Sequence, residues 1–314
     1  MVRPTSDSGS TGVIHMSRTV AQLTRLLLLA GAGTTWLAAP AAAQRPAPRD
    51  PGMIRVCADP DNMPSSNDKG EGFENKIAEL IAKDLKAKVT YVWYPTRRGY
   101  FRILNGMYCD MALEAPAGLD MTGVTKPYFR SGYVFIAREG SGLEDLNSLA
   151  DPRLKKLKIG VNVYTSDAEN SPPAMALSRY GVVGNLHGYF TFFSETDRPE
   201  DIVKGVANKD VDIAIAWGPL AGYFTKKLGV PLKLTPLPAK DSLSDIPFQY
   251  NMGVAVRRKD KEFRDSLQAV LERRRPEIQA ILKDYGVPLL PIQEEAKSTG
   301  DASAPADTGK KGTS

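Results

Sequence analysis

Histidine and cysteine are scarce in this chain of 314 residues, and neither sign of charge dominates it. The two histidines are His15 and His187, and His15 lies in a segment that we expect to be removed. An HExxH zinc site is therefore excluded, and a catalytic triad would depend on His187 alone. Of 41 Lys and Arg and 36 Asp and Glu, residues 1–43 hold three and one, which leaves 38 against 35. This small excess, without a long basic block, gives no reason to expect a nucleic-acid partner.

Motifs that hold nucleotides, metals or redox cofactors are also missing. The sequence has no GxxxxGK[ST] phosphate loop, no GxSxG nucleophile turn and no CxxC or CxxCH pattern. An acidic run begins at Asp59 and Asp61, but Met63 occupies the next ligand position, so the spacing is not that of an EF-hand. We therefore expect no cofactor, neither PQQ nor haem, and no metal site.

The first 43 residues have the pattern of a secretory signal peptide. Arg18 and Arg25 supply its positive region, residues 26–40 are mostly apolar, and three alanines precede Gln44. Met16 is an alternative start that would give the signal a normal length. A transmembrane anchor is the other interpretation, but the apolar run is shorter than the roughly 20 residues that a spanning helix needs. We expect cleavage near Gln44.

The compartment that this signal implies decides how the two cysteines are interpreted. No later apolar run approaches spanning length, so the mature protein is expected beyond the inner membrane, in the periplasm of a Gram-negative cell. In an oxidising compartment two cysteines more often form a structural disulfide than a reactive pair. We expect a disulfide between Cys57 and Cys109. Two buried free thiols are the alternative, which only geometry can remove.

Short β-rich runs alternate with helical patterns along the mature chain. The expected strands are 53–58, 88–93, 109–115, 133–138, 158–163, 186–193, 211–217 and 251–258. The expected helices are 73–85, 97–106, 173–180, 199–208, 219–228, 263–271 and 276–285. Apolar residues at helical spacing carry the helix predictions, such as Phe73, Ile77 and Ile81. The βαβαβ order predicts two units with parallel strands and right-handed crossovers.

Two α/β units joined by extended segments resemble the type II periplasmic solute-binding proteins, which include solute-binding protein family 3. Two longer stretches, "CADPDNMPSSNDKGEGFENKIA" at 57–78 and "WGPLAGYF" at 217–224, are more specific. They resemble the quinoprotein-dehydrogenase-associated branch, the MxaJ/XoxJ-type proteins, and the similarity covers about residues 53–290. The resemblance implies an α/β fold of two lobes, each a mostly parallel sheet flanked by helices, joined by two extended hinge segments. Lobe one would comprise 53–132 and 250–292, lobe two 133–249, with a disordered tail at 293–314.

Two positions depart from the amino-acid receptors of this superfamily. Those receptors hold the ligand carboxylate with an arginine ahead of the hinge, where this chain has Gly118. They bind the ammonium group with an aspartate where this chain has Trp217. A free amino acid would leave both charges poorly paired in a desolvated cleft, at a cost of several kcal/mol. The sequence therefore argues against an amino-acid ligand.

The residues that line the cleft are expected after the strand ends, because ligands of open α/β sheets lie beyond the carboxyl ends of the strands. The candidates are Asp59, Asn62, Ser65, Arg97, Arg98 and Glu114 in lobe one, and Tyr164, Thr165, Trp217 and Tyr223 in lobe two. They suggest an aromatic mouth with a few polar groups, suited to an apolar ligand or a protein loop. Each also has a structural interpretation: Asp59 caps a turn, Arg97 and Arg98 begin a solvated helix, and Trp217 fills core.

The resemblance implies a non-enzymatic periplasmic accessory protein of a PQQ-dependent methanol or alcohol dehydrogenase. Such a protein would contact the dehydrogenase or its c-type cytochrome during maturation or activation. A receptor of an ABC-type importer that does not use the amino-acid clamp is the alternative. A dehydratase-like enzyme comes third, with Glu114 and Asp59 as its candidate acid–base pair.

Two features bear on how such a protein would meet its partner. The basic runs 153–158 and 273–275 are either solvated helix faces or docking surfaces for an acidic partner. The lobes are expected to close on a bound segment through hinges near 131–134 and 247–251.

Overall fold

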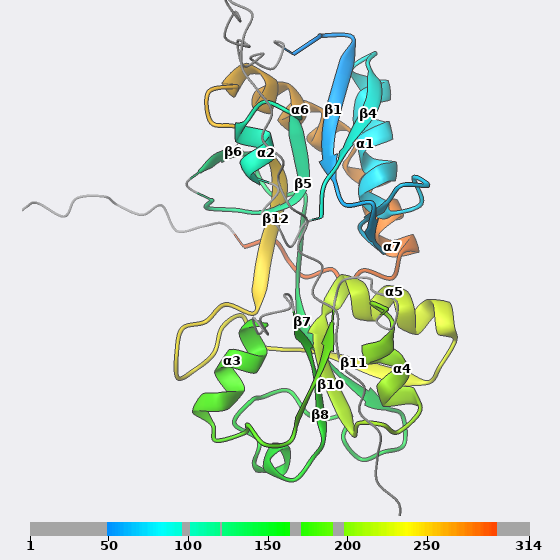
Figure 1. The fold of residues 1–314 in the computed structure, drawn as a ribbon, viewed down its shortest axis with the longest axis vertical. Helices are drawn as coiled ribbons and strands as arrows, with labels where there is room; N and C mark the ends of the chain where they lie inside the picture. Colours follow the sequence, from blue (N-terminus) through cyan, green and yellow to red (C-terminus); the bar gives the residue numbers. More distant parts are fainter. Residues whose placement is uncertain (1–48, 96–100, 120, 164–170, 191–197, 294–314) are drawn as a thin grey trace, which may run out of the picture. The chain divides into compact units, whose positions relative to one another are not determined.

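The computed structural model describes residues 49–95, 101–119, 121–163, 171–190 and 198–293 (Figure 1). Every element below belongs to one compact unit within residues 45–314. The predicted signal peptide, its cleavage site at Gln44 and the predicted tail beyond residue 293 lie outside the described residues. Among the residues that the structure does describe, no helix has the length and apolar character needed to cross a membrane.

Alternating strands and helices run through both halves of this unit. The strands are β1 (Met53–Ala58), β2 (Asp61–Asn62), β3 (Ser66–Asn67), β4 (Lys88–Trp93), β5 (Met111–Pro116), β6 (Thr122–Val124), β7 (Phe129–Arg138), β8 (Ile159–Val163), β9 (Leu186–Phe190), β10 (Ile213–Trp217), β11 (Leu232–Pro236) and β12 (Gln249–Arg257). The helices are α1 (Phe73–Asp84), α2 (Phe101–Asn105), α3 (Pro172–Arg179), α4 (Asp201–Ala207), α5 (Gly218–Leu228), α6 (Lys261–Arg273) and α7 (Arg275–Asp284), with a short 3-10 helix at Pro152–Lys155.

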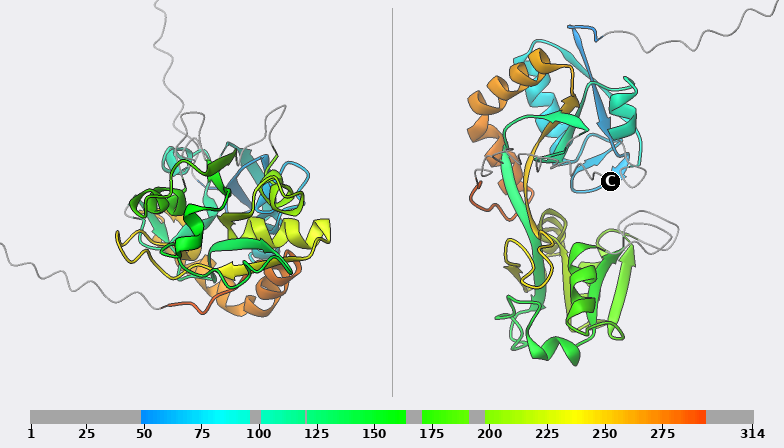
Figure 2. Two further views of the ribbon diagram at one scale, coloured as in Figure 1. Left: turned by 90° about the horizontal axis from the view of Figure 1, so that it is seen from below. Right: turned by 90° about the vertical axis from the view of Figure 1, so that its left-hand side faces the viewer.

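We use lobe one for the elements around the sheet β4-β1-β5-β12. In this sheet β1 pairs in parallel with β4 and β5, and β12 joins β5 in the antiparallel direction. The central position of β1 confirms the predicted βαβαβ unit with its parallel strands. Helix α1 packs on the sheet because Phe73, Ile77 and Ile81 recur every four residues and are fully buried. Helices α6 and α7 cover the same face as α1, and α2 packs with the opposite face (Figure 2).

We use lobe two for the elements around the parallel strands β9, β8 and β10. Strand β10 also pairs antiparallel with β7, and β7 carries β11 on its other edge. Helix α3 contributes to the core on one face of this sheet, and α4 and α5 contribute to the core on the other. The second βαβαβ unit predicted from the sequence is thus confirmed.

Strand β7 belongs to both sheets and carries the chain from one lobe to the other. Its residues 129–132 pair with β12, and residues 133–138 pair with β10 and β11. The change of partner falls where Gly132 faces Gln249. A Cβ on Gly132 would lie 2.7 Å from the carbonyl oxygen of Phe248, so this crossing requires glycine.

Several boundaries differ from the predicted ones. The expected strand 109–115 begins only at Met111, which leaves Cys109 just before the strand. The expected strand 186–193 is described only to Phe190, and the expected helix 97–106 only over 101–105. Strands β2, β3, β6 and β11 were not predicted, because two to five residues carry too little apolar periodicity to distinguish a strand from a turn.

The predicted disulfide between Cys57 and Cys109 is present. The two Cα atoms lie 5.5 Å apart, and both side chains are buried in a small cluster with Leu104, Ala112 and Ala255. The bridge links the end of β1 to the segment that enters β5, and these strands are neighbours in the sheet. The alternative of two free thiols is therefore wrong.

Candidate functional site

Glu114 is the centre of a hydrogen-bonded group that joins the two lobes. It lies in β5, and its Oε2 accepts a hydrogen bond of 2.6 Å from the hydroxyl of Ser65. Its Oε1 accepts a hydrogen bond of 2.9 Å from the indole Nε1 of Trp217. Its backbone N–H donates to the hydroxyl of Tyr128 at 3.3 Å, and its φ of 49° lies in the left-handed region. The structure thus brings together three of the predicted site residues: Ser65, Glu114 and Trp217.

Glu74 of lobe one is a further carboxylate that interacts electrostatically with this group. Glu74, near the start of α1, is only 9% exposed. Its pKa is raised well above the usual range by burial and then by the charges of Glu114 and Asp59, against a hydrogen bond from Ser66. Burial also raises the pKa of Glu114, although hydrogen bonds from Ser65 and Trp217 oppose the shift. The Glu74–Glu114 pair therefore favours holding a proton over carrying two negative charges.

Trp217 ends β10 and is the N-cap residue of α5. Its ring makes edge contacts with Tyr133 and Tyr250, at centroid distances of 5.5 and 6.0 Å. It packs against the hydrophobic clusters of both lobes. Trp217 therefore fills core, as one interpretation expected, and also makes a directed polar contact. An indole N–H cannot pair with an ammonium group, so the acid that clamps amino acids has no counterpart here.

Among the described residues, the start of α3 in lobe two has few free backbone donors for an anion. Helix N-termini bind carboxylates and phosphates through their first free N–H groups. The first two residues of α3 are Pro172 and Pro173, which have no N–H, and the N–H of Met175 is bonded to the carbonyl of Ser171. In lobe one, Gly118 is exposed in a left-handed turn after β5. Neither lobe therefore supplies a carboxylate clamp at these positions.

The remaining predicted site residues fall into separate places. Asp59 supports the turn before β2, because its Oδ1 accepts from the N–H of Asp61 at 3.1 Å. Asn62 pairs with Ser66 across β2 and β3, and its carbonyl accepts from the N–H of Ser65 at 2.8 Å. The ring of Tyr223 contacts the rings of Phe224 and Tyr285 instead of this group. Arg97, Arg98, Tyr164 and Thr165 lie outside the described residues.

Tyr223 lies on the flank of α5 and stacks on Tyr285 at the end of α7. The two rings are 5.7 Å apart and inclined by 17°. No contact found in the described part of the chain joins Tyr223 to Glu114 or Ser65.

The sequence analysis missed Glu74, Tyr128, Tyr133, Tyr250 and Met63. A signal existed for Glu74, because it lies one residue from Phe73 and three from Ile77, on the edge of the apolar stripe of α1. The three tyrosines lie in or next to β7 and β12, the two paired strands where the lobes meet. Nothing in the sequence distinguishes a site residue from a core residue in these strands. Met63 packs against a lobe-two cluster, a contact that no local pattern could predict.

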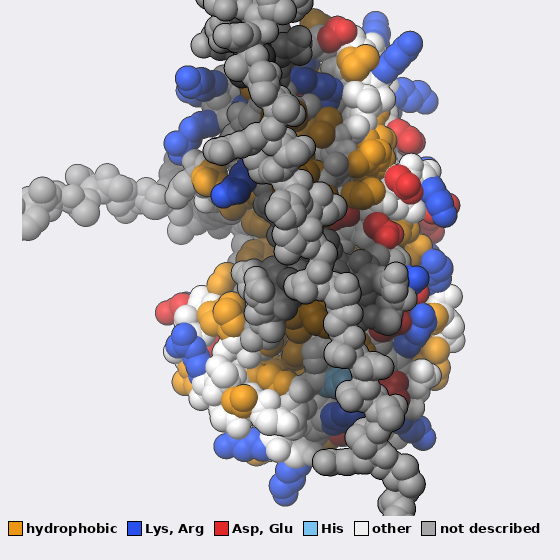
Figure 3. Space-filling model, viewed as in Figure 1, with side chains coloured by type: hydrophobic (Ala, Val, Ile, Leu, Met, Phe, Trp, Pro, Cys, Tyr) orange, Lys and Arg blue, Asp and Glu red, His pale blue; other side chains and the backbone are white. Residues whose placement is uncertain are grey.

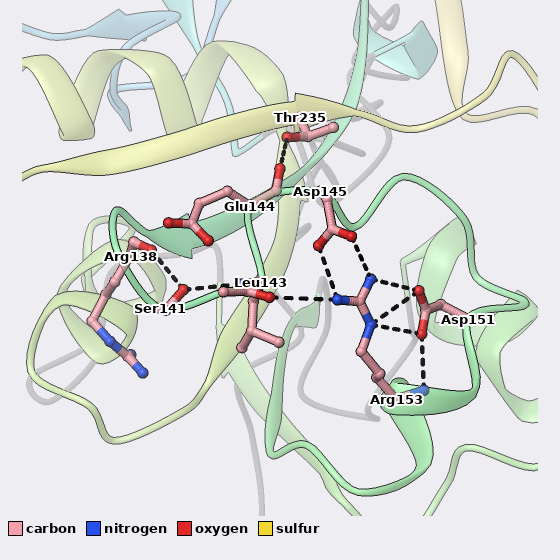
Figure 4. A network of polar contacts seen from close by, with 9 residues as sticks. Arg138, Ser141, Leu143, Glu144, Asp145, Asp151, Arg153 and Thr235 are labelled. Carbon is pink, nitrogen blue, oxygen red and sulfur yellow. Dashed lines mark hydrogen bonds and ion pairs between the residues drawn. The ribbon is translucent and has the colours of Figure 1, made fainter.

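Three of the seven basic side chains in the two basic runs form ion pairs within the described part of the chain. Arg153 pairs with Asp145 at 2.9 Å and with Asp151 at 2.8 Å (Figure 4). On the face shown in Figure 3, Lys and Arg side chains are scattered and have Asp and Glu among them.

In the second basic run, two of the three arginines form ion pairs. Arg274 pairs with Asp84 at 2.7 Å, and Arg273 pairs with the same carboxylate. Among the described residues, no ion pair is formed by the exposed side chains of Lys155, Lys156, Lys158 and Arg275. Each run therefore keeps at least one basic side chain outside the ion pairs of the described residues.

The described residues contain no group of three or more His, Cys, Asp and Glu side chains that could hold a metal ion. The carboxylate of Glu114 is instead engaged with one hydroxyl and one indole donor. The group is suited to holding a proton and to joining lobes.

Comparisons with known proteins agree with the fold and with the motifs. Residues 102–287 match the family of bacterial extracellular solute-binding proteins. Protein MoxJ of Methylorubrum extorquens is 32% identical over 261 residues, which are 77% of this chain and 83% of MoxJ.

Two crystal structures are similar as well. The periplasmic binding protein XoxJ from Methylobacterium extorquens AM1 is 37% identical with a TM-score of 0.61, over 76% of this chain and 99% of XoxJ. MxaJ from Methlophaga aminisulfidivorans MPT is 28% identical with a TM-score of 0.64, over 76% of this chain and all of MxaJ. The resemblance indicated by the sequence is confirmed. This chain belongs to the bacterial extracellular solute-binding proteins and, among them, to the two-lobed type II periplasmic binding proteins of the MxaJ/XoxJ type.

Proposed function

We propose that this chain is a non-enzymatic periplasmic accessory protein of a PQQ-dependent methanol or alcohol dehydrogenase. It would contact the dehydrogenase or its c-type cytochrome during maturation or activation. The observation that carries the proposal is the hydrogen bond from Trp217 to Glu114, which engages the side chain at the position where an amino-acid receptor would bind the ammonium group of its ligand. The similarity to MoxJ and XoxJ supports the choice of partner.

The chemistry of the site favours a protein partner over a small charged solute. Trp217, Tyr133 and Tyr250 form an aromatic group, and truncating an aromatic anchor in the centre of an interface commonly costs about 2 kcal/mol or more. We place the partner-facing surface around Trp217, with Asp59, Asn62 and Ser65 on the lobe-one side. We also assign to this surface four residues that lie outside the described ones: Arg97, Arg98, Tyr164 and Thr165.

Two binding measurements on the mature protein test the proposal. Standard amino acids at millimolar concentration should give no thermal shift, because stabilisation by a ligand follows its concentration relative to its Kd. The purified dehydrogenase or its cytochrome should bind measurably, and Trp217→Ala should weaken that binding about 30-fold, equivalent to about 2 kcal/mol. Tyr108→Ala, at an exposed position where the chain enters β5, is the matched control and should bind as the native protein does.

Each result has a defined meaning. An amino acid bound at micromolar Kd, with no association with either redox protein, would replace the accessory function with the importer receptor. Turnover of a solute would favour the dehydratase-like enzyme. Unchanged partner affinity in Trp217→Ala would move the docking surface elsewhere, most directly to Lys155, Lys156 and Arg275.

A further inference from the structure

Of the segment "WGPLAGYF", residues 217–224, the proposed function uses only Trp217, and the other residues have a separate role in packing. It forms the end of β10 and the first turns of α5 in lobe two. Its residues at positions 218, 222 and 226 lie on one flank of the helix, because they are four residues apart. This flank faces the chain that follows α7 (Figure 1).

The two glycines of this flank allow the backbone after α7 to come very close. A Cβ built on Gly222 would overlap the carbonyl oxygen of Gly286 and lie 3.2 Å from Pro288. A Cβ on Gly218 would lie 2.5 Å from the carbonyl oxygen of Gly132. Neither glycine has the positive φ that would require glycine for conformational reasons, so close packing explains both.

Side chains continue this contact along the helix. Tyr223 stacks on Tyr285. Lys226 forms an ion pair of 3.2 Å with Asp284 and also donates to its backbone carbonyl. At the other end of the same segment, the indole of Trp217 is bonded to Glu114. Helix α5 of lobe two is therefore held by lobe-one elements both at its N-cap and along its flank.

The segment after α7 is itself fastened to the crossing strands. Its Pro288 carbonyl accepts from the hydroxyl of Ser131 at 2.8 Å, and the N–H of Leu290 donates to the carbonyl of Arg130 at 2.9 Å. Asn251, on β12, donates to the carbonyl of Gln293 at 2.6 Å. The surface that α5 meets is thus anchored to both strands that connect the lobes.

We infer that residues 217–226 and 284–288 form a latch that holds the two lobes in one arrangement without a ligand. A receptor that closes on its solute needs two arrangements that a ligand can shift between. Here the contacts between lobes come from the chain itself, so ligand-driven closure of the kind expected from the sequence is replaced by a fixed geometry. The inference does not rest on the identity of the partner.

The test is a distance measurement between two spin labels on the mature protein alone. Lys76→Cys on α1 and Met175→Cys on α3 are exposed labelling sites in lobe one and lobe two. They would be the only free thiols, because Cys57 and Cys109 are the only native cysteines and are joined. Pulsed electron resonance should give one narrow distance distribution, unchanged by a millimolar mixture of amino acids.

Variants in the latch should change that distribution. Gly222→Ala should shift or broaden it, and Gly184→Ala, where a Cβ meets nothing within 4 Å, should leave it as in the native protein. If Gly222→Ala does not fold, as judged by circular dichroism, the double variant Tyr223→Ala and Lys226→Ala takes its place. A broad or two-peaked distribution in the native protein would overturn the latch, as would an unchanged distribution in the folded latch variant. Neither result bears on whether the dehydrogenase binds.

Discussion

The indole nitrogen of Trp217 and the carboxylate oxygen Oε1 of Glu114 lie 2.9 Å apart, although 103 residues separate them in the sequence. Trp217 comes from lobe two and Glu114 from lobe one, and Ser65 donates to the second oxygen of the same carboxylate. A half-buried carboxylate that accepts two directed hydrogen bonds is costly to leave unpaired.

Trp217→Phe should destabilise the protein by about 1–3 kcal/mol, because Phe keeps an aromatic ring and removes the donor to Glu114. Chemical denaturation at neutral pH measures the change. A double-mutant cycle with Glu114→Ala separates the contact from the ring's packing, and a coupling of about 0.5 kcal/mol or more is expected for residues in direct contact. Additive effects of the two substitutions would contradict a direct interaction.

Glu74→Gln should stabilise the protein at neutral pH and have less effect near pH 4. Because the folded-state pKa of Glu74 is raised, the folded protein holds a proton that the unfolded chain loses above about pH 4.5. The free energy of unfolding of the native protein therefore falls as the pH rises from about 4.5 through the folded-state pKa of Glu74. Glu74→Gln has no group that titrates there, so its stability does not fall in this way. Thermal melts from pH 4 to 8 measure it. Glu79→Gln, on the exposed side of α1, is the control, and an equal effect of both variants at every pH would contradict the prediction.

Asp110→Asn should cost about 3–5 kcal/mol, because Asp110 is fully buried between Arg55 at 2.8 Å and Arg257 at 3.2 Å. Burial alone would raise the pKa of Asp110, but hydrogen bonds from Arg55 and Arg257 hold it below its usual value. The stability it contributes should thus disappear as the pH falls through that lowered pKa. Asp145→Asn, in an exposed pair with Arg153, should cost at most about 1 kcal/mol. A similar loss of stability in the two variants would contradict the prediction that burial of the ion pair sets the cost.

Loss of the Cys57–Cys109 disulfide should lower the free energy of unfolding by about 4 kcal/mol in the chain-entropy model, since the bridge closes a loop of 52 residues. The double variant Cys57→Ser and Cys109→Ser should unfold at lower denaturant concentration than the native protein. Native protein treated with a strong reductant should approach the variant. Thiol titration of unreduced protein should find no free thiol, and two free thiols would contradict the bridge.

Secreted protein should begin within one or two residues of Gln44. The three alanines before it follow an apolar run, and signal cleavage favours small residues at such a site. Mass analysis of the N-terminus measures this directly. An intact Leu26–Ala39 segment in the secreted protein would contradict cleavage.

Much of the architecture follows from the sequence by itself. Apolar residues spaced for a helix identified α1 and α6, and the βαβ order predicted the parallel neighbours of β1 and β8. These inferences work because burial of a helix stripe or a strand is a local pattern repeated over several residues. Local periodicity failed for four short strands: β6 and β11 pair with the distant strands β12 and β7, and β2 and β3, of two residues each, pair with each other.

The candidate site depended more on the tertiary structure. The sequence named Ser65, Glu114 and Trp217 from their positions after strand ends, but their hydrogen bonds require the two lobes to meet. Glu74 became part of the group because α1 packs beside β5, and its raised pKa arises from burial that no neighbouring residue in the chain reveals. The glycines of "WGPLAGYF" were visible as a motif, yet their reason is the approach of Gly286, more than 60 residues away. A sequence specifies which groups are present and how they repeat, whereas distances between remote groups are set only when the whole chain packs.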